Sequence, residues 1–156
     1  MTAKSKGYLL LELLLAVGIL AVCASAFSVR SSALQTQQHK LKVRLAAQTL
    51  AADLRQLQQQ ALFQAEGTQV SLTVASGKAV SYSFKSGTKV LRTITFSSLA
   101  CDGVYFSSAI TRLGFSKAGT PTASGSYILK HTALANYRCL LSVQPVTGRV
   151  SVYEKE

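Results

Sequence analysis

The first half of the chain carries two successive patterns of apolar residues, and both are typical of a helix. Leu9 to Val29 is a run of 21 residues that is apolar almost throughout. As a helix it would span about 31 Å, close to the thickness of a bilayer core. Beyond it, apolar residues recur at three- to four-residue multiples between Gln, Lys and Arg. They are Leu34, Leu41, Leu45, Leu54, Leu57 and Ala61.

These two patterns predict one long helix from Tyr8 to about Gln64. No Pro or Gly interrupts the chain from Ile19 to Glu66, and Gly67 predicts the helix stop. The alternative is two helices with a break near Arg30, where several serines cluster.

After Gly67 the apolar pattern changes to a period of two, which is typical of strands. Gly, Ser, Thr and Pro clusters separate short alternating segments. The predicted strands are 68–75, 80–84, 90–96, 104–106, 112–115, 127–131, 137–144 and 149–153. The sequence therefore predicts an α+β chain, in which a long N-terminal helix packs on an all-β head of one twisted sheet or two sheets.

The apolar run predicts a membrane anchor at the N-terminus. Lys4 and Lys6 precede it, so the positive-inside tendency places the N-terminus in the cytoplasm and the remainder outside. A secretory signal peptide is the alternative, with Ala24-Ser25-Ala26 as its cleavage site. The length of the run and the carboxylate of Glu12 within it favour the anchor.

Glu12 needs a partner, because an ionised carboxylate in hydrocarbon costs about 2.5 to 3.5 kcal/mol on insertion scales. No Lys or Arg lies within a helical turn of it inside the run. Cutting the chain after Gly7 would free the α-amine of Tyr8, four residues from Glu12. That amine could also meet Glu12 of an adjacent subunit in a helical bundle.

The segment Lys6-Gly7-Tyr8-Leu9-Leu10-Leu11-Glu12 resembles the class III signal of type IV pilins and type II secretion pseudopilins. The resemblance implies cleavage between Gly7 and Tyr8 by a prepilin peptidase, N-methylation of Tyr8, and a role for Glu12 in assembly register. Tyr8 stands where the family usually has Phe, and Leu9 where it usually has Thr.

The resemblance divides the chain into four parts and implies a pilin-like fold. Residues 1–7 are a leader, 8–29 a transmembrane and filament-core helix, 30–66 its amphipathic continuation, and 67–156 a β-rich extracellular head. The implied partners are other pilin or pseudopilin subunits, the peptidase and the membrane. The expected location is the cell membrane, with a single pass, and the cell surface after assembly.

Three further segments resemble the GspH/FimT class of minor pseudopilins and competence pseudopilins of the ComGD type. They are the helix segment 52–62, the Phe-x-x-x-Gly segment Phe115 to Gly119, and the closing Gly148-Arg149-Val150. A competence pseudopilus that handles DNA is the better-supported setting. A type II secretion pseudopilus and a type IV pilus are the alternatives.

Cys101 and Cys139 both fall in the predicted extracellular head, where an oxidising setting allows a disulfide. A bridge would join a loop in the middle of the head to a late strand. The alternative is two buried free thiols. A metal site built from these two cysteines alone is not expected, and no cofactor is predicted.

The chain is strongly basic, with seventeen Lys and Arg against six Asp and Glu. Removing the leader leaves fifteen basic side chains against the same six. Such a balance favours polyanionic surroundings, and basic residues on one face would bind double-stranded DNA without reading its sequence. Some FimT-class proteins, which this chain resembles, bind DNA through a basic C-terminal strand with the pattern Gly-Arg-x-Arg. The resemblance makes Arg149 and Lys155 the candidate DNA contacts. Ser151 stands at the second basic position of that pattern. The alternative is a solvated basic surface that faces an anionic wall or membrane.

The scattered acidic residues and histidines give no support to an enzyme. The two histidines, His39 and His131, lie far apart in the sequence, and no CxxC or HxxxH motif occurs. No local motif identifies a set of catalytic residues. Two other classes remain as alternatives. One is a membrane-anchored ligand-binding protein, which requires an uncut Gly7–Tyr8 bond. The other is a secreted enzyme, which requires cleavage near Ala26.

Overall fold

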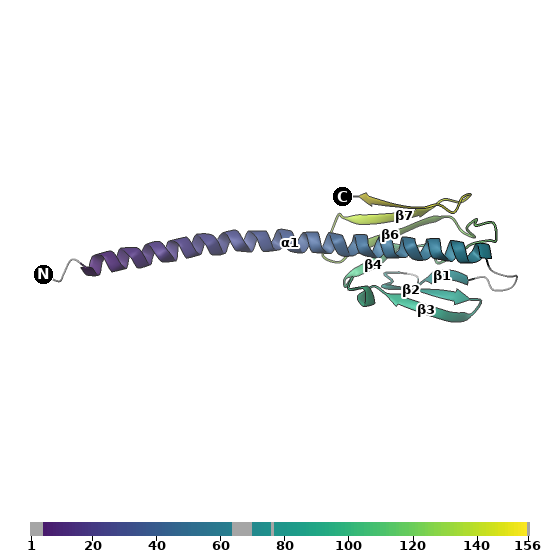
Figure 1. The fold of residues 1–156 in the computed structure, drawn as a ribbon, viewed down its shortest axis with the longest axis horizontal. Coiled ribbons are helices and arrows are strands. Elements are labelled where there is room, and N and C mark those ends of the chain that lie inside the picture. The colour runs from purple at the N-terminus through teal and green to yellow at the C-terminus, as the bar shows by residue number, and fades with distance from the viewer. Residues whose placement is uncertain (1–4, 64–69, 76, 156) are drawn as a thin grey trace. The chain divides into compact units, whose positions relative to one another are not determined.

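A computed structural model describes residues 5–63, 70–75 and 77–155, except for the side chains at 5–7, 9 and 26–31. Within these ranges the chain forms one long helix, a turn of 3-10 helix and eight strands (Figure 1). The helix is α1 (Ser5–Phe63) and the turn is η1 (Ser97–Leu99). The strands are β1 (Val70–Val74), β2 (Ser81–Ser86), β3 (Lys89–Thr95), β4 (Val104–Ser108), β5 (Arg112–Gly114), β6 (Gly125–His131), β7 (Arg138–Val143) and β8 (Val150–Lys155).

The chain divides into two compact units, Met1–Gln38 and His39–Glu156. In the first unit α1 is unbroken through Arg30, so the alternative of two helices is wrong. Its large apolar side chains are exposed from Leu10 to Val22, as is Leu34. Among the residues that the structure describes, no helix is both long and apolar enough to cross a membrane.

In the second unit, the head, α1 buries a stripe of mostly small residues. The buried positions are Val43, Ala46, Ala47, Leu50, Ala51, Leu54, Leu57 and Ala61. Of the apolar positions that mark the helical pattern in the sequence, Leu54, Leu57 and Ala61 are buried, whereas Leu41 and Leu45 are 56% and 50% exposed. The stripe follows the alanines because their small side chains let the strands approach the helix closely.

The eight strands form two antiparallel sheets. One sheet has the order β3-β2-β1-β5 and the other β4-β6-β7-β8. Figure 1 shows β1, β2 and β3 along one side of the head segment of α1, and β6 and β7 along the other. All eight strands predicted from the alternating pattern are present, and the α+β fold with a two-sheet head is confirmed. The predicted helix stop at Gly67 lies outside the described residues.

The core joins the two sheets through a chain of aromatic rings. Phe106 of β4 lies 5.1 Å from Phe96, 5.9 Å from Tyr127 of β6 and 6.4 Å from Tyr82 of β2, measured between ring centroids. All four rings are almost fully buried. Aromatic pairs at these separations add to the burial energy, so the two sheets and the helix share one core.

Candidate functional site

The predicted processing and assembly residues lie at the start of α1. The Gly7–Tyr8 bond is inside the helix, one turn from its first residue. Tyr8 is 75% exposed and Glu12 is exposed, and the spacing of four residues places both on one face of the helix. The structure of the single chain does not test cleavage, methylation or assembly, and these roles remain predictions.

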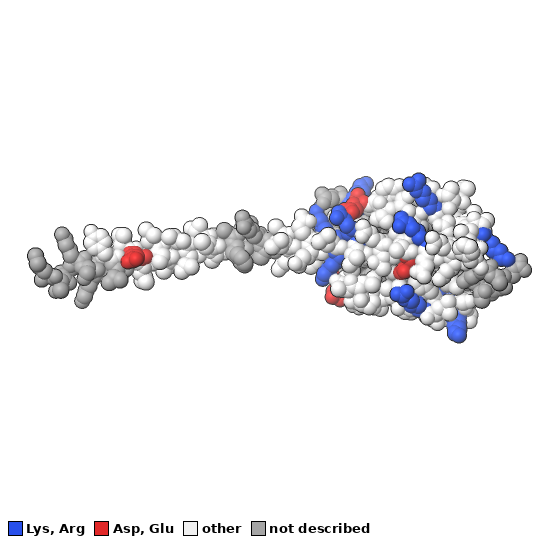
Figure 2. Space-filling model, in the orientation of Figure 1, with Lys and Arg blue, Asp and Glu red and all other residues white. Residues whose placement is uncertain are grey.

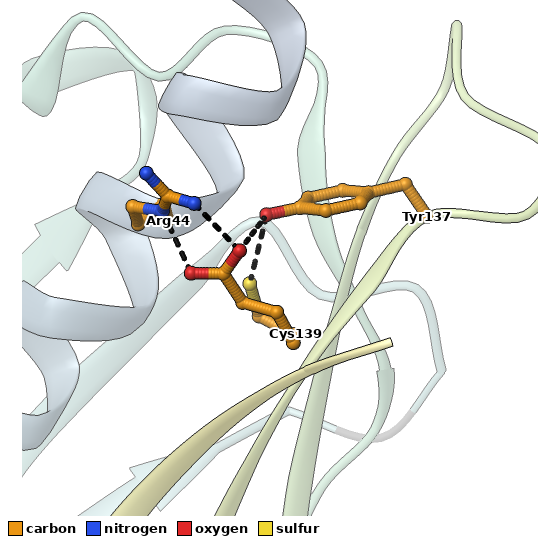
Figure 3. Close-up of polar contacts among 4 residues, drawn as sticks. Arg44, Tyr137 and Cys139 are labelled. Atoms are coloured by element: carbon orange, nitrogen blue, oxygen red, sulfur yellow. Dashed lines mark hydrogen bonds and ion pairs between the residues drawn. The ribbon is translucent and has the colours of Figure 1, made fainter. Parts of the chain in front are cut away.

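In the head, a polar cluster fastens the last strand to the helix. Arg44 of α1 donates from Nε and Nη2 to the two carboxylate oxygens of Glu154 in β8, each at 2.7 Å (Figure 3). Tyr137 Oη donates to Glu154 Oε2 at 3.1 Å. Lys40 Nζ lies 5.3 Å from the centroid of the Tyr137 ring, a cation–π contact. The bidentate geometry adds a directional contact between α1 and the end of β8, a strand that its ladder with β7 already holds in the sheet.

The ionisation states in this cluster suit a structural contact, and the pair of Arg44 and Glu154 is called the clamp below. The hydrogen bond from Arg44 lowers the pKa of Glu154, which therefore stays ionised. Burial raises the pKa of Tyr137 and of Cys139, so both keep their protons at neutral pH. A second arginine of α1, Arg55, lies 3.4 Å from the carbonyl oxygen of Val150 at the other end of β8. Sequence reasoning missed the clamp, because Arg44 and Glu154 are 110 residues apart.

The two head cysteines are free and buried, so the predicted bridge between Cys101 and Cys139 is wrong. Each thiol has its own neighbour: Cys101 Sγ lies 3.3 Å from the carbonyl oxygen of Leu99, and Cys139 Sγ 3.7 Å from Tyr137 Oη. Burial raises the pKa of the Cys101 thiol as well. The alternative of two buried free thiols is what the structure shows, and neither is an activated nucleophile.

The segments that resemble the pseudopilin subgroup meet at one point in the head. Gln58 of α1 donates through Nε2 to the carbonyl oxygens of Gly119, at 2.9 Å, and Thr147, at 3.2 Å. Gly148 follows with φ of +65°, and a Cβ there would lie 2.6 Å from the Gly119 oxygen and 3.1 Å from the Phe115 ring. Phe115, Gly119, Gly148 and Gln58 thus form one packed contact, which gives these patterns a structural reason.

The predicted DNA contacts lie at opposite ends of β8. Arg149 immediately precedes the strand and Lys155 ends it, and both are exposed. Six residues at about 3.3 Å each separate them by about 20 Å. Figure 2 shows Lys and Arg scattered over the visible face of the head, with few Asp or Glu among them. Arg149 and Lys155 are therefore not gathered in one compact patch.

No family model matches the sequence, and no curated protein matches it. Two crystal structures of the type IV minor pilin FimU from Pseudomonas aeruginosa, strain PAO1, match the structure. One gives a TM-score of 0.51 at 19% identity, covering 69% of this chain and 90% of FimU. The other gives 0.55 at 19% identity, covering 71% and 87%. The chain has a pilin-like fold.

The pilin-like head also contains a pair of stacked histidines. The rings of His39 on α1 and His131 at the end of β6 lie 4.2 Å apart between centroids. His131 is buried, and its Nδ1 accepts a hydrogen bond from the backbone N–H of Ala133 at 3.0 Å. Its Nε2 lies 3.0 Å from the carbonyl oxygen of Asp102, to which it must donate. His131 is therefore held as the neutral tautomer.

Among the described residues, no group of three or more His, Cys, Asp or Glu could hold a metal ion. The polar contacts described above are internal to the pilin-like head: Arg44 with Glu154, Gln58 with two carbonyls, and His131 with Asp102 and Ala133. Their geometry positions strands and turns on the helix.

Proposed function

We propose that this chain is a minor pilin-like subunit, a structural component of a type IV pilus-like filament. One observation carries the proposal. The Gly7-Tyr8 pair and Glu12 stand at the start of the same helix, α1, that continues into a head with a pilin-like fold. A processing motif alone is short, and a fold alone permits many functions. Their combination in one chain favours assembly with other pilin subunits and a structural, non-enzymatic role.

The proposed mechanism moves the subunit from membrane to filament. Residues 8–29, whose side chains at 9 and 26–29 lie outside the described residues, anchor the precursor in the cell membrane in a single pass. Cleavage after Gly7 gives a new amine at Tyr8. In the filament this amine pairs with Glu12 of a neighbouring subunit, because an ion pair offsets part of the cost of burying the carboxylate. The exposed apolar side chains of the first unit, such as Leu10 and Leu14, supply the surface that neighbouring helices cover.

Coexpression with a prepilin peptidase tests the first step. We expect the mature chain to begin at Tyr8 and to gain the mass of one methyl group, as measured by intact mass and N-terminal sequencing. Gly7→Leu should remain uncut, because the bulky side chain obstructs the cleavage position.

Glu12→Gln is the matched variant for the second step. It retains size and helix preference and removes only the charge, so it should be cut like the wild type. Its cross-linking to neighbouring subunits in intact cells should fall sharply, because the Tyr8 amine then has no carboxylate partner. An uncut wild-type chain, or one that begins at Phe27, would contradict the proposed function.

We further propose that the filament belongs to a competence system that handles DNA. The support is the basic head, which holds exposed Lys and Arg on both sheets, and the position of Arg149 and Lys155 at the two ends of the last strand. Phosphate contacts by such residues bind DNA without sequence preference.

Replacing both Arg149 and Lys155 with Gln should weaken binding of a short DNA duplex to the full chain in detergent. The slope of log K against log salt should fall by about 1.8, since each lost phosphate contact removes about 0.9. Fluorescence anisotropy across a salt series measures it. The control is Lys85→Gln with Lys89→Gln, which removes the same charge from the other sheet. An equal loss in both variants would reduce the effect to net charge and reject a site at β8.

A further inference from the structure

A groove opens between the head segment of α1 and the β3 edge of the first sheet. It has a volume of about 160 Å³. The helix contributes one wall, and Val70, Phe84, Leu91 and Arg92 contribute the remainder. The helical residues of this wall are Asp53, Gln56, Leu57 and Gln60. Arg92 stands directly opposite Phe84 in the β2–β3 register, so both side chains are on the face that looks toward the helix.

The strand that borders this groove has a free edge. β3 is the outermost strand of its sheet and pairs only with β2 among the described strands. Its first five residues, Lys89 to Thr93, are all exposed, and Val90 and Leu91 are each 52% exposed. Successive side chains of a strand point to opposite faces, so both faces of β3 are open here. Such an edge is a template for a further strand.

The strand border of the groove is basic, although its helical wall holds one carboxylate, Asp53. The β2–β3 hairpin contains three basic residues, Lys85, Lys89 and Arg92, and no acidic residue. Of the three, Arg92 lines the groove itself. No hydrogen bond or ion pair joins Arg92 to another described residue, although its charge acts on the buried Tyr82. The one acidic side chain in the groove wall, Asp53, accepts a hydrogen bond from Tyr82 Oη at 2.5 Å. An unpaired guanidinium beside an apolar floor fits a carboxylate next to an apolar side chain.

We propose that β3 and this groove bind an extended, acidic, strand-forming segment of a partner protein. The segment adds to the first sheet through backbone hydrogen bonds to β3. An apolar side chain enters the groove above Phe84, and a carboxylate pairs with Arg92. Strand addition of this type takes affinity from the main chain and selectivity from the side-chain pocket. This inference rests on the head alone and does not require the filament role.

The basic charge of β3 argues against a second copy of this chain as the occupant. Among the described strands only β8 contains an acidic residue, Glu154, and Arg44 already pairs with it. Antiparallel pairing of β3 with itself would place its own basic residues, Lys89 and Arg92, near those of the copy. Like charges across a strand pair are destabilising.

The test uses the full chain in detergent micelles and short synthetic peptides with capped ends. The main probe alternates Glu and Val around a central Leu. A second peptide has Gln in place of Glu, and a third has N-methylated backbone amides that block strand pairing. We expect the acidic peptide to bind in a fluorescence anisotropy titration, and the other two to bind at least about tenfold more weakly. At one peptide concentration below saturation, hydrogen exchange of the β3 amides should slow most with the acidic peptide.

Arg92→Gln should lower the affinity for the acidic peptide about tenfold. Arg149→Gln, with the same charge change, should bind the peptide as the wild type does. Both arginines are exposed, so thermal unfolding should show that both variants fold. Equal binding of the N-methylated peptide would reject strand addition, and equal binding of the Gln peptide would reject carboxylate recognition. Equal weakening by both substitutions would reject the groove as the site. If the wild-type chain self-associates and Arg92→Gln does not, the edge binds a second copy of the chain. If Arg92→Gln weakens the binding of duplex DNA as strongly as that of the peptide, the edge binds DNA. Either result would overturn the proposal.

Discussion

Gly148→Ala is expected to lower the free energy of unfolding of the head by about 3 kcal/mol or more. A residue with a Cβ pays about 1 to 2 kcal/mol at the positive φ of this turn, which is +65°. The new Cβ would also lie 2.6 Å from the Gly119 oxygen and 2.7 Å from Gln58 Nε2. One of the two hydrogen bonds of Gln58 must then lengthen or break, at about 1 kcal/mol. Urea unfolding of the full chain, followed by circular dichroism, measures the change.

Gly87→Ala is the matched control for this prediction. Gly87 has nearly the same conformation, with φ of +60°, but nothing lies within 4 Å of its Cβ position. It should therefore cost only the backbone term of about 1 to 2 kcal/mol. Equal destabilisation by the two substitutions would show that the Gly148 turn does not pack on Gln58, and the structural reason given for the closing Gly-Arg-Val pattern would be wrong.

The strands were predictable from the sequence, but the face of the helix was not. An alternating pattern such as Val70, Leu72 and Val74 identifies both the strand and its buried face. The side chains of a strand point to two faces in turn, so the apolar positions all lie on one of them. In α1 the large leucines at 41 and 45 compete with the alanines at 46 and 47 for the core. Burial of a larger apolar surface favours the leucines as the core-facing residues, whereas the close approach of the two sheets to the helix favours the alanines. Only the three-dimensional packing decides between them.

The parts of the candidate site differ in the same way. Gly7, Tyr8 and Glu12 lie within six residues, so a local motif was sufficient to single them out. The clamp between Arg44 and Glu154 and the contacts of Gln58 join residues 61 to 110 positions apart. No local signal marks such pairs. The disulfide prediction failed for a related reason: compartment and cysteine number permit a bridge, but the distance between the two thiols depends on the fold.

Acid is expected to destabilise the head below about pH 6.5 because His131 is buried in its neutral form. Burial is the main cause that lowers its pKa, and the nearby His39 and Lys42 of α1 add to it, while the hydrogen bond to the Asp102 carbonyl opposes it. A proton on Nδ1 would also break the bond from the Ala133 N–H. Above pH 6.5 folded and unfolded chains both hold a neutral imidazole, so stability there does not depend on this group.

As the pH falls below 6.5, the unfolded chain takes up the proton before the folded chain does. The free energy of unfolding should then decrease with a slope that approaches 1.4 kcal/mol per pH unit, and level off below the pKa of the folded state. Urea unfolding at a series of pH values between 7 and 5 measures this slope. The chain has only two histidines, and Glu154, with its lowered pKa, stays ionised throughout the range.

His131→Gln should remove most of this slope, even where it lowers stability at neutral pH, because glutamine does not titrate. His39→Gln is the control. It retains the burial of His131, which is the largest cause of the shift, and should therefore keep most of the slope. A slope that survives His131→Gln and disappears in His39→Gln would assign the acid sensitivity to the helix residue and reject a neutral, buried His131. A wild-type chain with equal stability at pH 7 and pH 5 would reject it as well, since a buried imidazole that charges without cost is not desolvated.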